Sequence, residues 1–341
     1  MNKKKWNKLA VSCMLAGLAA TILLTLLGWR YYIRTVEKNE WGELLNAREY
    51  SRHYVMIPDE SSSNLWQDIY ESAKAAAAEQ DAYVEFLCDW SAGEYTPVSY
   101  VDIAIAAKVD GIIVKPDGTA KMREAINAAE DAGIPVVTVL DDDTDSSRKS
   151  FVGINSYQMG TTYGHQVLNC IDESTRRITV LLDSRDSGKD LIFKEMKATI
   201  QEELPAEMKE RVDIQSLRIA ESSMFDAEEI IRDLFNGGQD RPDILVCMNE
   251  EYSECAYQAM VDYNQVGDVD IIGYYRSDTM LNAVQKGNVP IAVTLDAEQV
   301  GRRSVEALEE YYSMGYTSSY FSVDLDIITK QNVKRFLKEK K

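Results

Sequence analysis

The sequence predicts an α/β protein whose body consists of two similar lobes, each built on a doubly wound parallel sheet. Short apolar runs rich in Val and Ile recur along the chain, most of them at intervals of about 20 to 34 residues with a helix-periodic segment between them. Ten such runs fall into two groups of five, which indicates two sheets rather than one. Their near-continuous apolar character is typical of parallel strands that helices cover on both faces.

The apolar runs give the expected strands in chain order. The strands are predicted at residues 53–57, 83–87, 111–114, 135–140, 151–154, 178–182, 212–219, 243–248, 270–275 and 290–294. After the first of them, Leu65, Ile69 and Ala73 repeat at helical spacing, and the three serines at 61–63 can cap the first turn of that helix. Units of strand, helix and strand therefore account for most of the chain from residue 53 onward.

Charge excludes one class of partner. The 341 residues contain 37 Lys and Arg against 56 Asp and Glu, which gives a net charge of -19. Four lysines are the only charged side chains before residue 30, so the remaining body is even more acidic than the whole chain. Such a body repels phosphate backbones, and we expect no nucleic-acid partner.

The N-terminal region predicts one transmembrane helix. Residues 9–29 form an uncharged, mostly apolar run, about the length that crosses a bilayer as a helix. Lysines precede it and mixed charges follow it, so we expect residues 1–8 to form a cytoplasmic basic segment and residues 30–52 a connector. The protein is then a single-pass protein of the cell membrane, with its body outside the cytoplasm in the cell envelope.

Two other fates of this region stay open. A secretory signal that is cleaved would export the same body, although its apolar part is usually shorter and ends at small residues. Lipid attachment at Cys13 is disfavoured, because most of the apolar run follows this cysteine instead of preceding it. In each case the body is exported.

Motifs for catalysis and metal binding are missing from the sequence. The two histidines, His53 and His165, belong to no metal-binding or triad-like pattern, and no GxSxG or complete phosphate-binding loop occurs. The acidic run at 141–145 begins like a calcium loop but lacks its glycine and its final glutamate. We therefore expect no enzyme activity, no cofactor and no metal.

Polar side chains follow most of the predicted strands. In open α/β sheets, ligands bind outside the carboxyl ends of the strands, so these positions are the first candidates for a site. They are Pro58-Asp59-Glu60, Asp89-Trp90, Lys115-Pro116-Asp117, Asp141-Asp142-Asp143, Asp183-Ser184-Arg185, Asn249-Glu250 and Tyr275-Arg276.

Seven stretches, read in order, resemble the type I periplasmic binding proteins, the ribose- and galactose-binding-like sugar-binding proteins of ABC importers. The stretches are KVDGIIVKPDG (108–118), AINAAEDAGIPVVTVLDDD (125–143), FVGINSYQMGTTYG (151–164), DILVCMNEEYSECAYQAM (243–260), VGDVDIIGYYRSD (266–278), KGNVPIAVTLDAEQVGRRSVEAL (286–308) and DIITKQNV (326–333). Their order and spacing resemble those of the family over residues 53–333.

The resemblance implies an arrangement of the two lobes. Family members clamp a ligand in a cleft between lobes that three crossing segments join, and the cleft closes by a hinge motion. Here the crossings are expected near residues 152–156, 292–297 and 320–326. Lobe one then covers about 50–153 and 297–321, and lobe two about 154–293 and 324–338.

The resemblance also implies ligand-binding residues. Trp66 from lobe one and Phe225 from lobe two match the aromatic residues that stack on a sugar ring. Arg185 matches the arginine that grips sugar oxygens, and Asn249 matches the asparagine after a strand. These side-chain types suit a sugar, whose hydroxyls need hydrogen-bonding partners and whose ring face packs on aromatic rings.

At three positions the match is open or broken. Asp141 or Asp142 corresponds to the acid at a strand end, because the extra residue Leu140 leaves two registers. Tyr275 stands where the family has an acid, and Leu295 stands where it has a glutamine. Either the ligand is then more apolar, modified or larger than a simple sugar, or the pocket no longer serves transport, unless these two side chains only pack the cleft wall.

By this resemblance, the protein is an extracytoplasmic substrate-binding protein. It would capture a carbohydrate-like small solute, a sugar or sugar derivative, by hinge closure and deliver it to the permease of an ABC-type importer. The alternative is a ligand sensor, anchored in the membrane by its N-terminal helix, that signals to a histidine kinase or chemoreceptor. An uncleaved anchor favours the alternative, since delivery to an importer does not require a tether by this helix.

Overall fold

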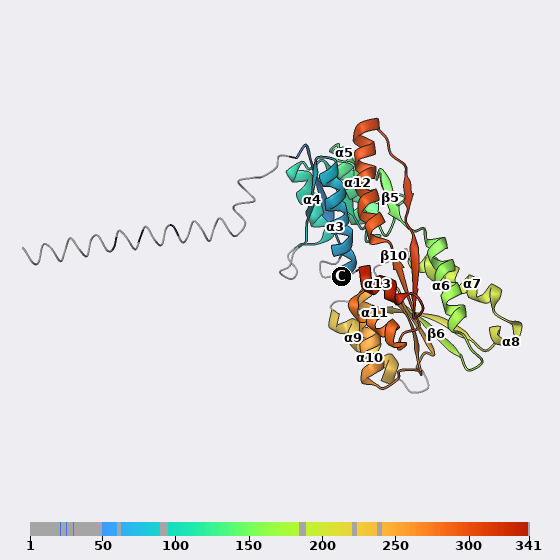
Figure 1. Cartoon of the computed structure of the whole chain (residues 1–341). Coiled ribbons are helices and arrows are strands. Elements are labelled where there is room, and N and C mark those ends of the chain that lie inside the picture. The colour runs from blue at the N-terminus through green and yellow to red at the C-terminus, as the bar shows by residue number, and fades with distance from the viewer. Residues whose placement is uncertain are drawn as a thin grey trace, which may run out of the picture. The chain divides into compact units, whose positions relative to one another are not determined.

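The computed structural model describes residues 50–59, 63–88, 95–183, 189–219, 224–236 and 241–339, together with positions 21, 25 and 30 (Figure 1). The chain divides into two compact units, Met1–Tyr50 and Ser51–Lys341, and the elements named below belong to the second. The expected membrane segment at 9–29 lies outside the described residues except at positions 21 and 25. Among the described helices, none combines the length and apolar character that a membrane crossing requires.

The first sheet has six strands in the order β11-β5-β4-β3-β1-β2, and its paired strands are parallel. We call this sheet and its helices lobe one. Its strands are β1 (Arg52–Ile57), β2 (Ala82–Phe86), β3 (Gly111–Val114), β4 (Val136–Val139), β5 (Ser150–Gly153) and β11 (Tyr320–Ser322). Its helices are α3 (Asn64–Glu79), α4 (Pro97–Ala107), α5 (Ala120–Asp131) and α12 (Ala297–Met314).

The second sheet also has six strands, in the order β12-β10-β9-β8-β6-β7, and with its helices it forms lobe two (Figure 1). Its strands are β6 (Arg177–Asp183), β7 (Asp213–Ile219), β8 (Ile244–Cys247), β9 (Asp270–Tyr274), β10 (Ile291–Leu295) and β12 (Leu325–Thr329). Its helices are α6 (Ser156–Cys170), α7 (Lys189–Glu203), α8 (Ala206–Lys209), α9 (Met224–Asn236), α10 (Glu250–Asp262), α11 (Asp278–Lys286) and α13 (Val333–Glu339).

All ten predicted strands are present, and two further strands, β11 and β12, were not predicted. The expectation of purely parallel sheets was wrong at one pair, because β12 runs antiparallel to β10. The connection explains this direction. The chain passes from β10 into α12 of lobe one and returns through β11, and only Val323 and Asp324 separate β11 from β12. The returning strand therefore enters the second sheet opposite to the strand that left it.

Hydrogen bonds hold the crossing segments to one another. The Val323 N–H donates to the carbonyl of Gly153 at 3.2 Å, and the Asp296 N–H donates to the carbonyl of Asp324 at 3.0 Å. The side-chain amide of Gln299 donates to the carboxylates of Asp296 at 2.9 Å and Asp324 at 2.8 Å. The three passages between the lobes thus form one bonded group.

Apolar packing is continuous between the two lobes. One buried cluster contains Trp66 and Val152 from lobe one together with Tyr163 and Val180 from lobe two. Helix pairs pack tightly within each lobe: a Cβ on Gly301 of α12 would lie 2.2 Å from the carbonyl oxygen of Ile69 on α3. The helices and strands that carry the polar side chains of the cleft are therefore closely packed.

Candidate ligand-binding cleft

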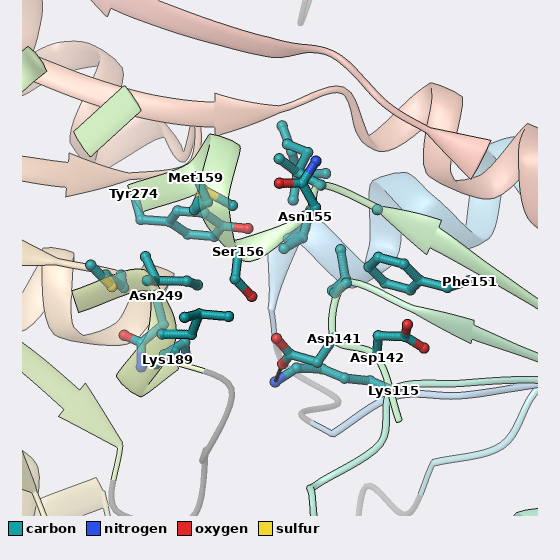
Figure 2. A pocket seen from close by; sticks show the side chains of 18 of the residues that line it. Lys115, Asp141, Asp142, Phe151, Asn155, Ser156, Met159, Lys189, Asn249 and Tyr274 are labelled. Atoms are coloured by element: carbon teal, nitrogen blue, oxygen red, sulfur yellow. Dashed lines mark ion pairs between the residues drawn. The ribbon is translucent and has the colours of Figure 1, made fainter. Parts of the chain in front are cut away.

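A cavity of about 510 Å³ lies where the carboxyl ends of strands from both sheets meet. This volume falls within the range of small-molecule sites. Figure 2 shows Lys115, Asp141, Asp142 and Phe151 of lobe one on one side, and Tyr274 and other lobe-two residues on the other. Further lining residues from lobe two are Asn155, Ser156, Met159, Tyr163, Lys189, Ile192, Met248 and Asn249.

The lobe-one wall is held by a chain of polar contacts. Asp59 follows β1, and its carboxylate accepts hydrogen bonds from the Trp66 indole N–H at 2.6 Å and from the Lys115 ammonium. The same ammonium lies 3.3 Å from a carboxylate oxygen of Asp141. Trp66 is only 2% exposed, so both its packing and its hydrogen bond fix the ring in place.

These contacts keep the Asp59 carboxylate charged. Burial by itself raises the pKa of Asp59, but the Lys115 charge, the hydrogen bonds from Lys115 and Trp66, and the Lys189 charge lower it more. The net pKa lies below the ordinary value of an aspartate. At neutral pH the lobe-one wall therefore presents an ionised carboxylate whose charge Lys115 already balances.

The end of β4 explains the two registers that the sequence left open. Leu140, the extra residue, adopts a left-handed backbone conformation with φ 66°, and the Asp141 N–H donates back to the Val139 carbonyl at 2.8 Å. After this tight turn both Asp141 and Asp142 line the cavity. Their partners differ, because Asp141 pairs with Lys115 whereas Asp142 accepts from the Arg148 guanidinium at 2.6 Å.

The lobe-two wall contains polar groups with spare bonding capacity. Asn249 caps α10, where its side-chain oxygen accepts from the Tyr252 N–H at 2.7 Å, and its NH₂ group is a donor for other partners. Tyr163 on α6 is 1% exposed, and within the described part of the chain its hydroxyl has no hydrogen-bond partner. Burial raises the pKa of Tyr163, so its hydroxyl is neutral and can donate or accept.

The two tyrosines at the end of β9 take different directions. Tyr274 lines the cavity. Tyr275 is fully buried outside the cavity lining, adopts φ 65°, and donates its hydroxyl to the Asp68 carboxylate on α3. Burial, with the nearby Asp68 charge, raises the pKa of Tyr275, so the phenol keeps its proton as a donor. Where the family has an acid, this chain thus has Tyr275, which forms a contact between the lobes with Asp68.

The cavity brings together four of the seven predicted site residues, Trp66, Asp141, Asp142 and Asn249. Tyr275 lies beside it. Arg185 lies outside the described residues, and Phe225 belongs to α9 at a position whose side chain is not described.

Most of the lining residues were not among the predicted site residues, and Lys115, Tyr274 and Tyr163 show why. Lys115 follows a strand, so the strand-end rule singled it out as a candidate. Tyr274 stands one place before the strand-end tyrosine that was chosen. Tyr163 lies inside a helix, where the sequence gives no sign that it lines a ligand site.

The cavity suits a small molecule without net charge. The charges of Asp59 and Asp141 are balanced by those of Lys115 and Lys189, and Asp142 is paired with Arg148. The remaining lining carboxylate, Glu250, is held by hydrogen bonds from Ser63, Asn64 and the Leu65 N–H. No group of metal-binding side chains occurs among the residues that the structure describes. Apolar side chains form much of the remaining wall: Leu65, Leu140, Phe151, Ile154, Met159, Leu191, Ile192, Met248 and Leu295.

Two α/β lobes, three crossings and a cleft at the strand ends define the architecture of a solute-binding protein. The family model described as a periplasmic binding protein domain matches residues 54–315. The chain therefore belongs to the periplasmic binding protein family.

Comparisons with individual proteins agree with this family. A Rhizobium meliloti protein that carries the name of a rhizopine-binding protein is 23% identical over 243 residues, 70% of this chain and 77% of its own length. The glucose-galactose binding protein GanP of Geobacillus stearothermophilus has a similar fold, with a TM-score of 0.73 and 20% identity over 82% of this chain and 98% of that one. XylFII, 26% identical with a TM-score of 0.71 over the same shares, has also been solved as a XylFII–LytSN complex.

Proposed function

We propose that this protein captures a carbohydrate-like small solute outside the cytoplasm by closing its two lobes and delivers it to an ABC-type importer. The observation that carries the proposal is the cavity, in which a fixed tryptophan and a charge-balanced wall of lobe one face the Asn249 amide and Tyr163 of lobe two. Closure would be a population shift, because a ligand that contacts both walls binds the closed arrangement better than the open one.

The ligand class follows from the balance of apolar and polar wall. Leu295 and Tyr274 occupy the cavity near the positions where family members have an amide and an acid. A simple hexose would place a hydroxyl against the apolar side chain of Leu295, and an unpaired buried hydroxyl is costly. We therefore expect a neutral sugar derivative with an apolar substituent, such as an O-methyl or deoxy sugar, to bind more tightly than the parent sugar.

A sensor role is the second candidate. In it, the N-terminal run at 9–29 stays in the membrane as an anchor and the closed lobes signal to a histidine kinase or chemoreceptor. The XylFII–LytSN complex supports this candidate, because it shows that a protein of this fold can assemble with another polypeptide.

Melting of the full chain tests the binding function. Glucose, galactose, xylose, arabinose and their methyl glycosides are added singly, and we expect at least one methyl glycoside to raise the Tm. Trp66→Ala should abolish that rise, whereas Lys121→Met, which changes an exposed lysine of α5 away from the cavity, should leave it intact. If no sugar raises the Tm, the proposed ligand class is wrong.

Capture experiments separate the two candidates. The importer role predicts that the liganded protein binds the permease of an ABC transporter and stimulates its ATPase. The sensor role predicts that it binds the extracytoplasmic region of a sensor kinase and changes autophosphorylation. Cell fractionation and protease treatment of intact cells test the proposed location. We expect the added protease to digest the body from outside.

A further inference from the structure

At the edge of the cavity, a second set of contacts joins the lobes without involving any ligand; of its residues, Ser63, Leu65 and Glu250 also line the cavity. Glu250, the first residue of α10 in lobe two, reaches the first turn of α3 in lobe one. Its carboxylate accepts from the Ser63 hydroxyl at 2.9 Å, the Asn64 side-chain amide at 2.6 Å and the Leu65 N–H at 3.3 Å. Glu250 is only 8% exposed, so water competes little for these bonds.

This contact replaces the helix cap that the sequence predicted. Ser63 occupies the N-cap position of α3, but its side chain makes no capping bond and donates to Glu250 instead. A helix N-terminus leaves N–H groups without intrahelical partners and favours a negative charge. Lobe two therefore supplies the cap of a lobe-one helix, and opening the cleft would remove it.

One turn further along α3, Asp68 forms the other half of this set. It accepts from the Tyr275 hydroxyl, and its carboxylate lies 3.6 Å from the Arg276 guanidinium, both from lobe two. Tyr275 holds a left-handed backbone conformation, which is unfavourable for a bulky residue and persists where surrounding contacts impose it. None of these residues belongs to the three crossing segments.

We infer that these contacts form a clasp, composed of Glu250, Tyr275 and Arg276 of lobe two on the first turns of α3, that sets how much of the protein is closed before a ligand binds. Apparent affinity depends on the fraction of molecules in the binding-competent state. The clasp therefore tunes affinity through residues such as Asp68 that are absent from the cavity wall. Only this effect on affinity rests on the proposed function.

Hydroxyl-radical footprinting of the full chain without added ligand tests the clasp. Trp66 and Met248 are buried on opposite cavity walls, at 2% and 6% exposure, so opening should increase their oxidation. Met122 on α5 is fully buried away from the cavity and reports unfolding instead. We expect Asp68→Ala to raise oxidation of Trp66 and Met248 about fivefold or more and to leave Met122 unchanged, since each lost bond shifts the equilibrium about 3- to 10-fold.

Two further variants decide the outcome. Glu71→Ala removes an exposed acid from the same helix, and it should give the wild-type pattern. Tyr275→Phe deletes a single oxygen, so it should open the cleft even if Asp68→Ala or Glu250→Ala also exposes Met122. Wild-type oxidation of Trp66 and Met248 in Tyr275→Phe would overturn the clasp, as would the same increase in Glu71→Ala.

A ligand arm separates this inference from the proposed function. With the sugar that gives the largest melting shift as probe, Asp68→Ala should weaken binding by about the same factor as it opens the cleft. If no sugar binds but the footprint changes, the clasp stands and the proposed function fails. If sugars bind and Asp68→Ala changes neither footprint nor affinity, the proposed function stands and the clasp fails.

Discussion

The two walls of the cavity differ in how their polar groups are used. On the lobe-one wall, Asp59, Trp66, Lys115 and Asp141 already bind one another. On the lobe-two wall, the Asn249 amide keeps donors available, and within the described residues the Tyr163 hydroxyl has no partner. One wall is thus arranged by the protein itself, while the other has bonding capacity left for a ligand.

This difference predicts which substitutions affect the fold and which affect only binding. A change in the lobe-one network leaves a buried or charged group without its partner, so stability and affinity should fall together. A change in an open group of lobe two removes nothing from the free protein, so affinity alone should fall.

Trp66→Ala should have the largest effect. The ring is almost fully buried in the core that joins the lobes, and deleting such a side chain costs about 3 to 5 kcal/mol. We expect a lower midpoint in urea unfolding and loss of the ligand-dependent rise in Tm. Trp66→Phe keeps an aromatic face but removes the donor to Asp59, and it should retain part of both properties. Equal losses in the two variants would show that the Asp59 bond, not the ring, is what matters.

Lys115→Met should have an intermediate effect that depends on pH. The lowered pKa of Asp59 means that its charge stabilises the folded state above the ordinary aspartate pKa of 3.8, and this contribution disappears as pH falls through the lower folded value. Without Lys115, Asp59 and Asp141 lose their shared cation, and the contribution is lost at neutral pH as well. We expect about 1 kcal/mol, a modest cost because the Asp59 side chain is 39% exposed and water screens the pair.

Urea unfolding at pH 7 and at steps down to pH 3 measures this effect. The difference between wild type and Lys115→Met should be largest at pH 7 and should shrink in acid, below the ordinary pKa of Asp59. Lys121→Met serves as the matched control and should show no such convergence. A difference that stays constant with pH would mean that Lys115 acts through packing of its aliphatic stem.

Sequence patterns predicted the parts of this molecule that depend on local burial. A strand that is buried on both faces has a continuous run of apolar residues, so β3 and β8 could be predicted from the sequence. The pair β11 and β12 was missed because both strands are only partly buried, with polar residues among their apolar ones. The strand-end rule found both acids after β4, since the polar residues after a buried strand are visible in the sequence.

Contacts between distant residues left no such pattern. The left-handed conformations of Leu140 and Tyr275 direct the neighbouring side chains, yet neither residue type signals that backbone. Glu250 is 187 positions from Ser63 in the chain, so no local reading reveals that it caps α3. The positions of the clasp residues and of the Tyr163 hydroxyl depend on how the helices pack. This packing cannot be predicted from local sequence patterns.

Tyr163→Phe should have the smallest effect and the most selective one. It deletes a buried hydroxyl that has no partner among the described residues, so the free energy of unfolding should stay the same or rise slightly. Affinity for the best sugar of the melting panel should fall about 3- to 10-fold, the range of one hydrogen bond. Tyr70→Phe is the control, because its hydroxyl donates to the Val84 carbonyl at 3.4 Å and Tyr70 is not part of the cavity wall. Titration calorimetry on both variants gives the comparison; an unchanged affinity in Tyr163→Phe would mean that the lobe-two wall holds its ligand through Asn249 and apolar contact alone.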